Sequence, residues 1–236
     1  MRKLNKLNNS QYWKKSYQHL QPNLTRYLRW TKLKICTGVW LNGESSWLTE
    51  KQWHLYPGCY EEESYIISSA FHKKWGIELK FYDMVSCDGN VFIRYFEVIN
   101  HSHHVKRLQL LFHQAPYGPA AFDGVTYYSS SKKALIHSQN DKYTLVSANL
   151  HEPKPKDVIM FGTGEKEEIW KDREGKLLFS PFHTFGQESI LSCSVKVDGH
   201  GKKSGKLWSI FQEDFTSLEN NHRILQSLSS NSNSFI

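Results

Sequence analysis

The chain has 236 residues, of which 39% are hydrophobic and 14% aromatic, and its formal net charge is +7. This length suffices for one large β domain or two small domains, and a sandwich of this length can bury a sizeable core without disulfides or metals. The charge first suggests a nucleic-acid partner, but nine of the 30 basic residues precede Cys36 and the first acid is Glu44. The remaining 21 basic residues accompany 23 acids, so the body is nearly neutral, and we expect no nucleic-acid binding.

The four cysteines, Cys36, Cys59, Cys87 and Cys193, form no CxxC motif for redox or zinc chemistry. We therefore expect free thiols, a reducing compartment, and neither a metal nor another cofactor. No apolar run approaches the roughly 18 residues of a membrane span, and the basic N-terminus lacks the apolar stretch of a secretory signal. The sequence predicts a cytoplasmic protein without a membrane partner.

Residues 1–32 form a basic segment without a clean hydrophobic period, and Pro22 interrupts any helix there. From Leu33 the pattern changes to short strands separated by turns, and we assign 33–213 to a β domain. The first strand, 33–41, ends at Asn42-Gly43, a strong turn pair.

A long hairpin over residues 76–100 is the clearest single prediction. Ile77, Leu79 and Phe81 alternate with polar residues before the Asp88-Gly89 turn, and the alternation extends to Asp83. After the turn, one face of the second strand carries Phe92, Arg94, Phe96 and Val98.

Further short strands follow at regular spacing, which is typical of a sandwich or barrel and not of βαβ units. They are expected at 64–71, 105–114, 124–128, 134–138, 142–148, 157–163, 187–199 and 205–212. The predicted fold class is therefore all-β, a large antiparallel sandwich.

The end of the chain has a different period. From Phe215 on, Leu218, Ile224, Leu225 and Leu228 recur at helical spacing, which predicts an amphipathic helix over 214–228 capped by Thr216 or Ser217. Such a helix needs a packing partner. A Ser/Asn-rich tail at 229–236 is expected to be disordered.

Several stretches resemble, in order, the N-terminal domain of bacterial glucoamylase-like enzymes of glycoside hydrolase family 15. They are TGVWLNGESSWL (37–48), WGIELKFYDMVSCDGNVFIRYFEVIN (75–100), HVKRLQLLFHQ (104–114), GVTYYSSSKKALIHSQNDKYTLVSAN (124–149) and GTGEKEEIWKDREGKL (162–177). The resemblance spans about residues 33–228. Its specificity comes from the order of strand patterns, since none of the stretches is a catalytic motif.

The resemblance implies a "supersandwich" like that of galactose mutarotase. In complete enzymes of the family, a helical linker joins this domain to an (α/α)6 barrel that supplies an acid and a base for inverting hydrolysis of α-glucosidic bonds. The helix at 214–228 resembles the start of that linker, and the chain stops there. The catalytic glutamates of the barrel therefore have no counterpart here, and we assign no catalytic residue.

Aromatic residues are concentrated between positions 40 and 60. Trp40, Trp47, Trp53, Tyr56 and Tyr60 could stack on sugar rings, fill the core, or face a barrel domain. They are the candidate carbohydrate contacts, and the core or a domain interface is the alternative that the pattern favours.

The acids and histidines offer weaker candidates. Glu61-Glu62-Glu63, Glu167-Glu168 and Glu188 are expected on solvated faces, because adjacent carboxylates on a strand point to opposite sides. The cluster of His101, His103 and His104, with His113 nearby, lacks a helpful carboxylate or Cys spacing for a metal. No His/Glu pair is evident from the sequence.

Three functions follow as hypotheses. The leading one is a non-catalytic domain, as a fragment or a stand-alone relative, that packs on a barrel and shapes substrate access. The alternatives are an independent carbohydrate-binding module using the Trp-rich region, and mutarotase- or epimerase-like chemistry on a free sugar.

Overall fold

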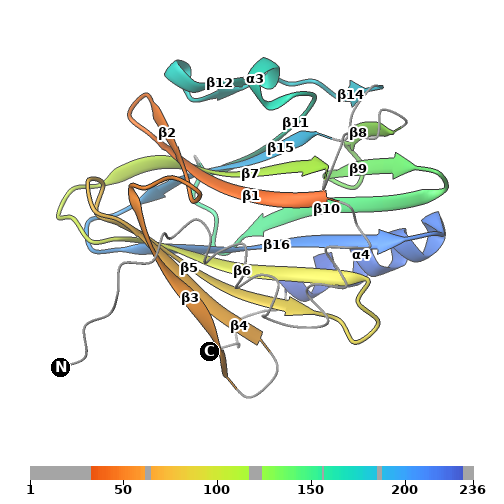
Figure 1. Cartoon of the computed structure of the whole chain (residues 1–236), viewed down its shortest axis with the longest axis horizontal. Helices are drawn as coiled ribbons and strands as arrows, with labels where there is room; N and C mark the ends of the chain where they lie inside the picture. Colours follow the sequence, from red (N-terminus) through yellow and green to blue (C-terminus); the bar gives the residue numbers. More distant parts are fainter. Residues whose placement is uncertain (1–32, 62–64, 117–123, 156, 185–187, 231–236) are drawn as a thin grey trace.

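The computed structural model describes residues 33–61, 65–116, 124–155, 157–184 and 188–230. Within these ranges most elements are β-strands, and they form two large antiparallel sheets packed face to face (Figure 1). The predicted all-β sandwich with a short C-terminal helix is thereby confirmed. The expectations for residues 1–32 and for the tail after 230 lie outside the described residues.

Within the described ranges, one sheet has five strands and is called the small sheet. Its spatial order is β11 (Val158–Thr163), β15 (Ser189–Val197), β7 (Lys106–Pro116), β1 (Leu33–Leu41) and β2 (Glu44–Trp47). The other sheet has nine described strands and is called the large sheet. Its order is β14 (Phe182–His183), β8 (Val125–Ser129), β9 (Ala134–Gln139), β10 (Lys142–Leu150), β16 (Lys202–Gln212), β6 (Val91–Asn100), β5 (Ile77–Val85), β4 (Tyr65–His72) and β3 (Trp53–Glu61).

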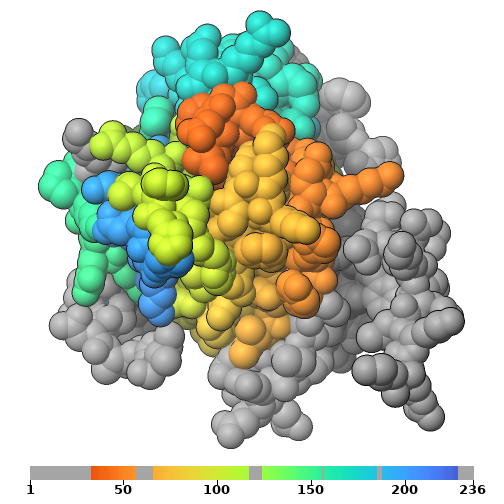
Figure 2. Space-filling view, turned by 90° about the vertical axis from the view of Figure 1, so that its left-hand side faces the viewer, coloured from red at the N-terminus to blue at the C-terminus, as the bar shows by residue number. Residues whose placement is uncertain are grey.

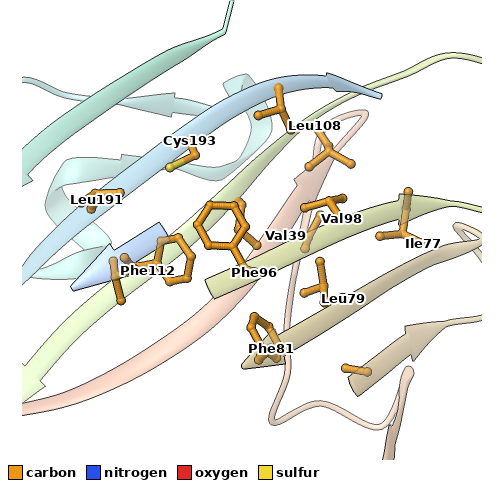
Figure 3. Packing of buried hydrophobic residues seen from close by; sticks show 14 of the residues in the cluster. Val39, Ile77, Leu79, Phe81, Phe96, Val98, Leu108, Phe112, Leu191 and Cys193 are labelled. Carbon is orange, nitrogen blue, oxygen red and sulfur yellow. The ribbon is translucent and has the colours of Figure 1, made fainter. Parts of the chain in front are cut away.

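The core between the two sheets follows from the period of two that the strands carry. In β5 and β6 every second residue is buried, and the register places Phe81 opposite Phe96 and Leu79 opposite Val98. Phe112 of the small sheet meets Phe96 with ring centroids 5.4 Å apart, so side chains of the two sheets interlock (Figure 3). The inner face predicted for the hairpin is confirmed.

Two tight turns explain how neighbouring strands pair. Asn42 and Gly43, between β1 and β2, have φ angles of 54° and 89°, a left-handed pair that matches the twist of a two-residue hairpin. Asn140 and Asp141 repeat this arrangement between β9 and β10, with φ angles of 48° and 56°. Asn and Asp tolerate this conformation better than bulky residues do.

A buried ion pair joins β5 and β6 inside the core. Arg94 donates from Nε and Nη2 to the two carboxylate oxygens of Asp83, at 2.7 and 2.6 Å, and from Nη1 to Thr37 Oγ1 at 3.2 Å. Both charged residues are 5% exposed. The guanidinium also lies 4.7 Å from the Phe81 ring centroid. The two-pronged geometry satisfies both charges where water is excluded.

Helix α4 (Phe215–Ser230) packs on the outer face of the large sheet (Figure 1). Leu218 and Leu225 of the helix join a cluster with Trp208 and Ile210 of β16 and Leu145 of β10. This burial supplies the partner that an amphipathic helix of this length requires. No helix within the described ranges has the length and apolar character needed to cross a membrane.

The start of α4 corrects the capping prediction. The carboxylate of Asp214 accepts the backbone N–H of Thr216 at 3.2 Å and of Ser217 at 2.7 Å. Asp214, and not Thr216 or Ser217, is therefore the capping residue, because its side chain reaches the free N–H groups of the first turn. At its other end the helix runs to Ser230, two residues beyond the predicted end.

Candidate functional site

Trp53 lies in the core, which corrects its assignment as a sugar-contact candidate. The residue is 2% exposed, and its Nε1 donates to Ser46 Oγ at 3.0 Å. The ring packs edge-on against His72 and Trp75, with centroids 4.9 and 6.5 Å away. No face of this indole is open for stacking on a ligand.

Trp40 packs against a short segment that lies over the small sheet. The segment consists of α3 (Lys166–Ile169), β12 (Trp170–Lys171), η1 (Asp172–Glu174) and β13 (Lys176–Leu177). Trp40 Nε1 donates to the backbone oxygen of Asp172 at 2.6 Å. Gly175, at a φ of 59°, fits under the indole, where a Cβ would come within 2.4 Å of the ring. Figure 2 shows this segment, in cyan, directly above the orange-red β1–β2 hairpin. The main role of the Trp40 side chain is therefore to pack this segment onto the small sheet.

Trp47 remains half-exposed on the same outer face of the small sheet. Its ring lies over Gly38, where a Cβ would come within 2.7 Å of it. The His113 ring approaches edge-on, with centroids 6.0 Å apart, and Lys166 Nζ lies 5.1 Å from the indole centroid. An aromatic face beside polar groups is the arrangement that sugar contacts use.

Tyr56 and Tyr60 do not join Trp47. Tyr56 pairs with Ser69 in the β3–β4 ladder, on the outer face of the large sheet, and is 58% exposed. The Tyr60 side chain lies outside the described residues. The aromatic residues that are neighbours in sequence are thus separated in space, and Trp47 is the candidate with polar partners around it.

A His/Glu pair that the sequence did not reveal lies beside Trp47. His113 Nε2 is 2.9 Å from Glu188 Oε2, and the same oxygen accepts the Lys166 backbone N–H at 3.2 Å. Burial lowers the pKa of His113 below its ordinary value, against the opposing effect of the Glu188 carboxylate. The Glu188 side chain is 31% exposed, so it could accept a hydrogen bond from a sugar hydroxyl next to the indole.

A second polar cluster lies between the two sheets. Ser189 Oγ is 2.7 Å from Gln114 Oε1 and 3.2 Å from His137 Nε2, and His137 Nδ1 is 3.1 Å from Thr126 Oγ1. Because the amide oxygen can only accept, Ser189 uses its single proton there and accepts from His137 Nε2–H. The imidazole is therefore not a base for this hydroxyl, and the cluster satisfies buried polar groups instead of forming a nucleophile.

The remaining histidines of the turns are spread over different partners. His101 Nε2 lies 2.8 Å from Glu78 Oε2, and His103 Nδ1 lies 2.9 Å from His200 Nε2. Figure 2 shows the two turns that carry His103 and His200 side by side, in yellow-green and blue. Among the described residues, no group of three or more His, Cys, Asp or Glu side chains has the arrangement of a metal site. Glu167 and Glu168 are exposed, as expected.

Comparisons with known proteins place the fold. No protein-family model matches the sequence, and no curated protein matches it. A bacterial glucoamylase solved with acarbose has a TM-score of 0.55 at 11% identity, over 80% of this chain and 30% of that one. A heparinase III structure has a TM-score of 0.46 at 12% identity, over 75% of this chain and 24% of that one.

In fold, then, the chain is an all-β sandwich that is similar to part of a bacterial glucoamylase. It spans about 30% of the glucoamylase chain that it matches. At this level of identity the likeness concerns the fold, and what the domain does has to be argued from its own residues.

Proposed function

We propose that this chain is the non-catalytic sandwich domain of a glucoamylase-like enzyme of glycoside hydrolase family 15. It would pack on an (α/α)6 barrel, which carries the catalytic acid and base, and shape access of α-glucosidic substrates to it. The likeness to part of a bacterial glucoamylase supports this proposal most directly. The free thiols of Cys36, Cys87 and Cys193 favour a cytoplasmic setting.

The chemistry of inverting hydrolysis supports assigning catalysis elsewhere. It needs two carboxyl groups about 6.5–9.5 Å apart across the scissile bond. Glu188, the carboxylate next to Trp47, accepts from His113 and from a backbone N–H, which suits a binding or structural role. We expect the purified chain to release no glucose from maltooligosaccharides above the buffer blank. Steady glucose release by the chain alone would reject the proposal.

Carbohydrate binding at Trp47 is a second candidate, because that indole is half-exposed beside Glu188, His113 and Lys166. Calorimetry with maltooligosaccharides should then show saturable binding with a dissociation constant of about a millimolar. Trp47→Ala should weaken carbohydrate binding by roughly 3- to 10-fold, because it removes the contribution of one aromatic contact to the binding free energy. Glu188→Gln should weaken carbohydrate binding by a similar factor, although it keeps the shape of the side chain.

Tyr56→Ala is the matched control, since Tyr56 is exposed on the large sheet, on the other side of the molecule. It should leave the affinity unchanged. Absence of heat at millimolar ligand, or equal weakening by the Trp47 and Tyr56 variants, would argue against this site. Mutarotase- or epimerase-like chemistry, for which His113–Glu188 would be the pair to test, stays a prediction.

A further inference from the structure

Polar side chains gather on the outer face of the large sheet, next to the last turns of α4. The register places Asn149, Lys206 and Tyr95 side by side on β10, β16 and β6. His151, which follows β10, lies next to Ser204 on β16, with Nδ1 and Oγ 3.5 Å apart. The neighbouring part of this face, under α4, is apolar and includes Trp208 and Ile210.

Lys206 is the unusual member of this group. It is 2% exposed, and its Nζ donates to the backbone oxygen of Leu225 at 3.0 Å. An ammonium group has three N–H donors, so two of them have no acceptor within the described part of the chain. Buried charged groups are normally paired, and burial of this one lowers the pKa of Lys206.

Two further polar groups around Lys206 lack a partner among the described residues. The Tyr95 ring centroid is 6.0 Å from Lys206 Nζ and 6.4 Å from the His151 ring. The Tyr95 hydroxyl has no hydrogen-bond partner in the described ranges, and neither does His151 Nε2. Both side chains are half-exposed, so the group is open to solvent on their side.

The simplest structural explanation is that Lys206 donates to a carbonyl group near the C-terminal end of α4, where the helix dipole attracts a cation. This explanation uses one donor, the one that Leu225 accepts. It leaves the other two N–H donors of Lys206, which is 2% exposed, without a hydrogen-bond acceptor in the described part of the chain. Donors gathered around a buried positive charge are groups that an oxyanion can use, since it accepts several hydrogen bonds at once.

We propose that Lys206, Tyr95, His151 and Ser204 form a binding site for the oxyanion of a small ligand, a carboxylate or a phosphate. The anion would lie beside Tyr95 and His151, whose rings contact each other edge-on with centroids 6.4 Å apart, and accept from the Lys206 ammonium. The aromatic faces of Tyr95 and Trp208 flank the position, with Lys206 Nζ 5.2 Å from the Trp208 centroid. The site lies on a different sheet from Trp47.

Calorimetric titration with inorganic phosphate, glucose 6-phosphate and glucuronate tests the site, with glucose as the neutral probe. We expect saturable binding of at least one anion with a dissociation constant below about 1 mM. Glucose should not bind at Lys206. Binding of phosphate and glucose 6-phosphate alone would identify a phosphate site, and binding of glucuronate a sugar carboxylate site. No binding of any anion at 10 mM (on the order of ten times the expected constant) would overturn the proposal.

Lys206→Met removes the charge and keeps the length, and it should weaken anion binding by at least about tenfold. Lys202→Met is the control, because Lys202 is an exposed lysine on the same strand that pairs with Glu97; it should change the affinity less than about twofold. Equal weakening by the two variants would mean nonspecific attraction and reject the site. If Lys206→Met does not fold, Tyr95→Phe is the second variant. It removes one hydroxyl and should weaken anion binding by about fivefold. Unchanged affinity in Tyr95→Phe would also reject the site.

Discussion

Arg94→Met should lower the free energy of unfolding by about 3–5 kcal/mol, because it leaves the Asp83 carboxylate buried without its partner. Asp83 is 5% exposed and accepts two hydrogen bonds from the guanidinium, at 2.7 and 2.6 Å. Water cannot replace these donors without opening the sandwich. Urea unfolding followed by tryptophan fluorescence measures the change.

The double variant Asp83→Leu/Arg94→Met is the matched control. It removes both charges from a site lined by Phe81 and Phe92, so most of the stability lost in Arg94→Met should return. A single variant that loses less than about 1 kcal/mol would show that the pair is hydrated and not buried.

Trp53→Ala should lower the free energy of unfolding by about 3–5 kcal/mol, the cost of emptying a buried aromatic site. The indole is 2% exposed and packs against Trp75 and His72. The variant also leaves Ser46 Oγ without the donor at 3.0 Å. Urea unfolding gives the value, provided that the slope of the transition is unchanged.

Tyr56→Ala, three residues along the same strand, is the control for Trp53→Ala. Because Tyr56 is 58% exposed, its loss should change stability by no more than about 0.5 kcal/mol. A Trp53→Ala protein that keeps full stability and loses carbohydrate binding would reverse the assignment of Trp53 to the core.

Strand alternation was enough to predict the β5–β6 hairpin and its buried face. The period of two assigns Phe81 and Asp83 to the same side, and the Asp88-Gly89 turn fixes where the chain reverses. Alternation also places Arg94 on that side. What it cannot give is the register that sets Asp83 opposite Arg94, since a shift of the pairing changes which residues meet.

Strand β3 was not predicted, for a local reason. Its sequence WHLYPGCYE contains Pro57 and Gly58, which usually end strands. The structure accommodates them because β3 is the edge strand of the described large sheet, and its register with β4 shifts between Tyr56 and Cys59. Proline is tolerated where no neighbour needs its N–H, and a bulge absorbs the irregularity.

The candidate sites depend on contacts between distant segments, which residue patterns do not reveal. His113 and Glu188 are 75 positions apart and meet because β15 pairs with β7. Lys206 meets Leu225 because α4 folds back onto β16. Trp47 and Trp53 look equivalent in sequence, yet one lies on the outer face of the small sheet and the other in the core.

The most direct test of the proposed non-catalytic role is to measure glucose release from maltotriose by the purified chain. The expected rate equals that of the buffer blank, for the unaltered chain and for Glu188→Gln alike. A rate well above the blank that disappears in Glu188→Gln would contradict the assignment, because it would show that a carboxylate of the sandwich itself takes part in cleaving the glycosidic bond.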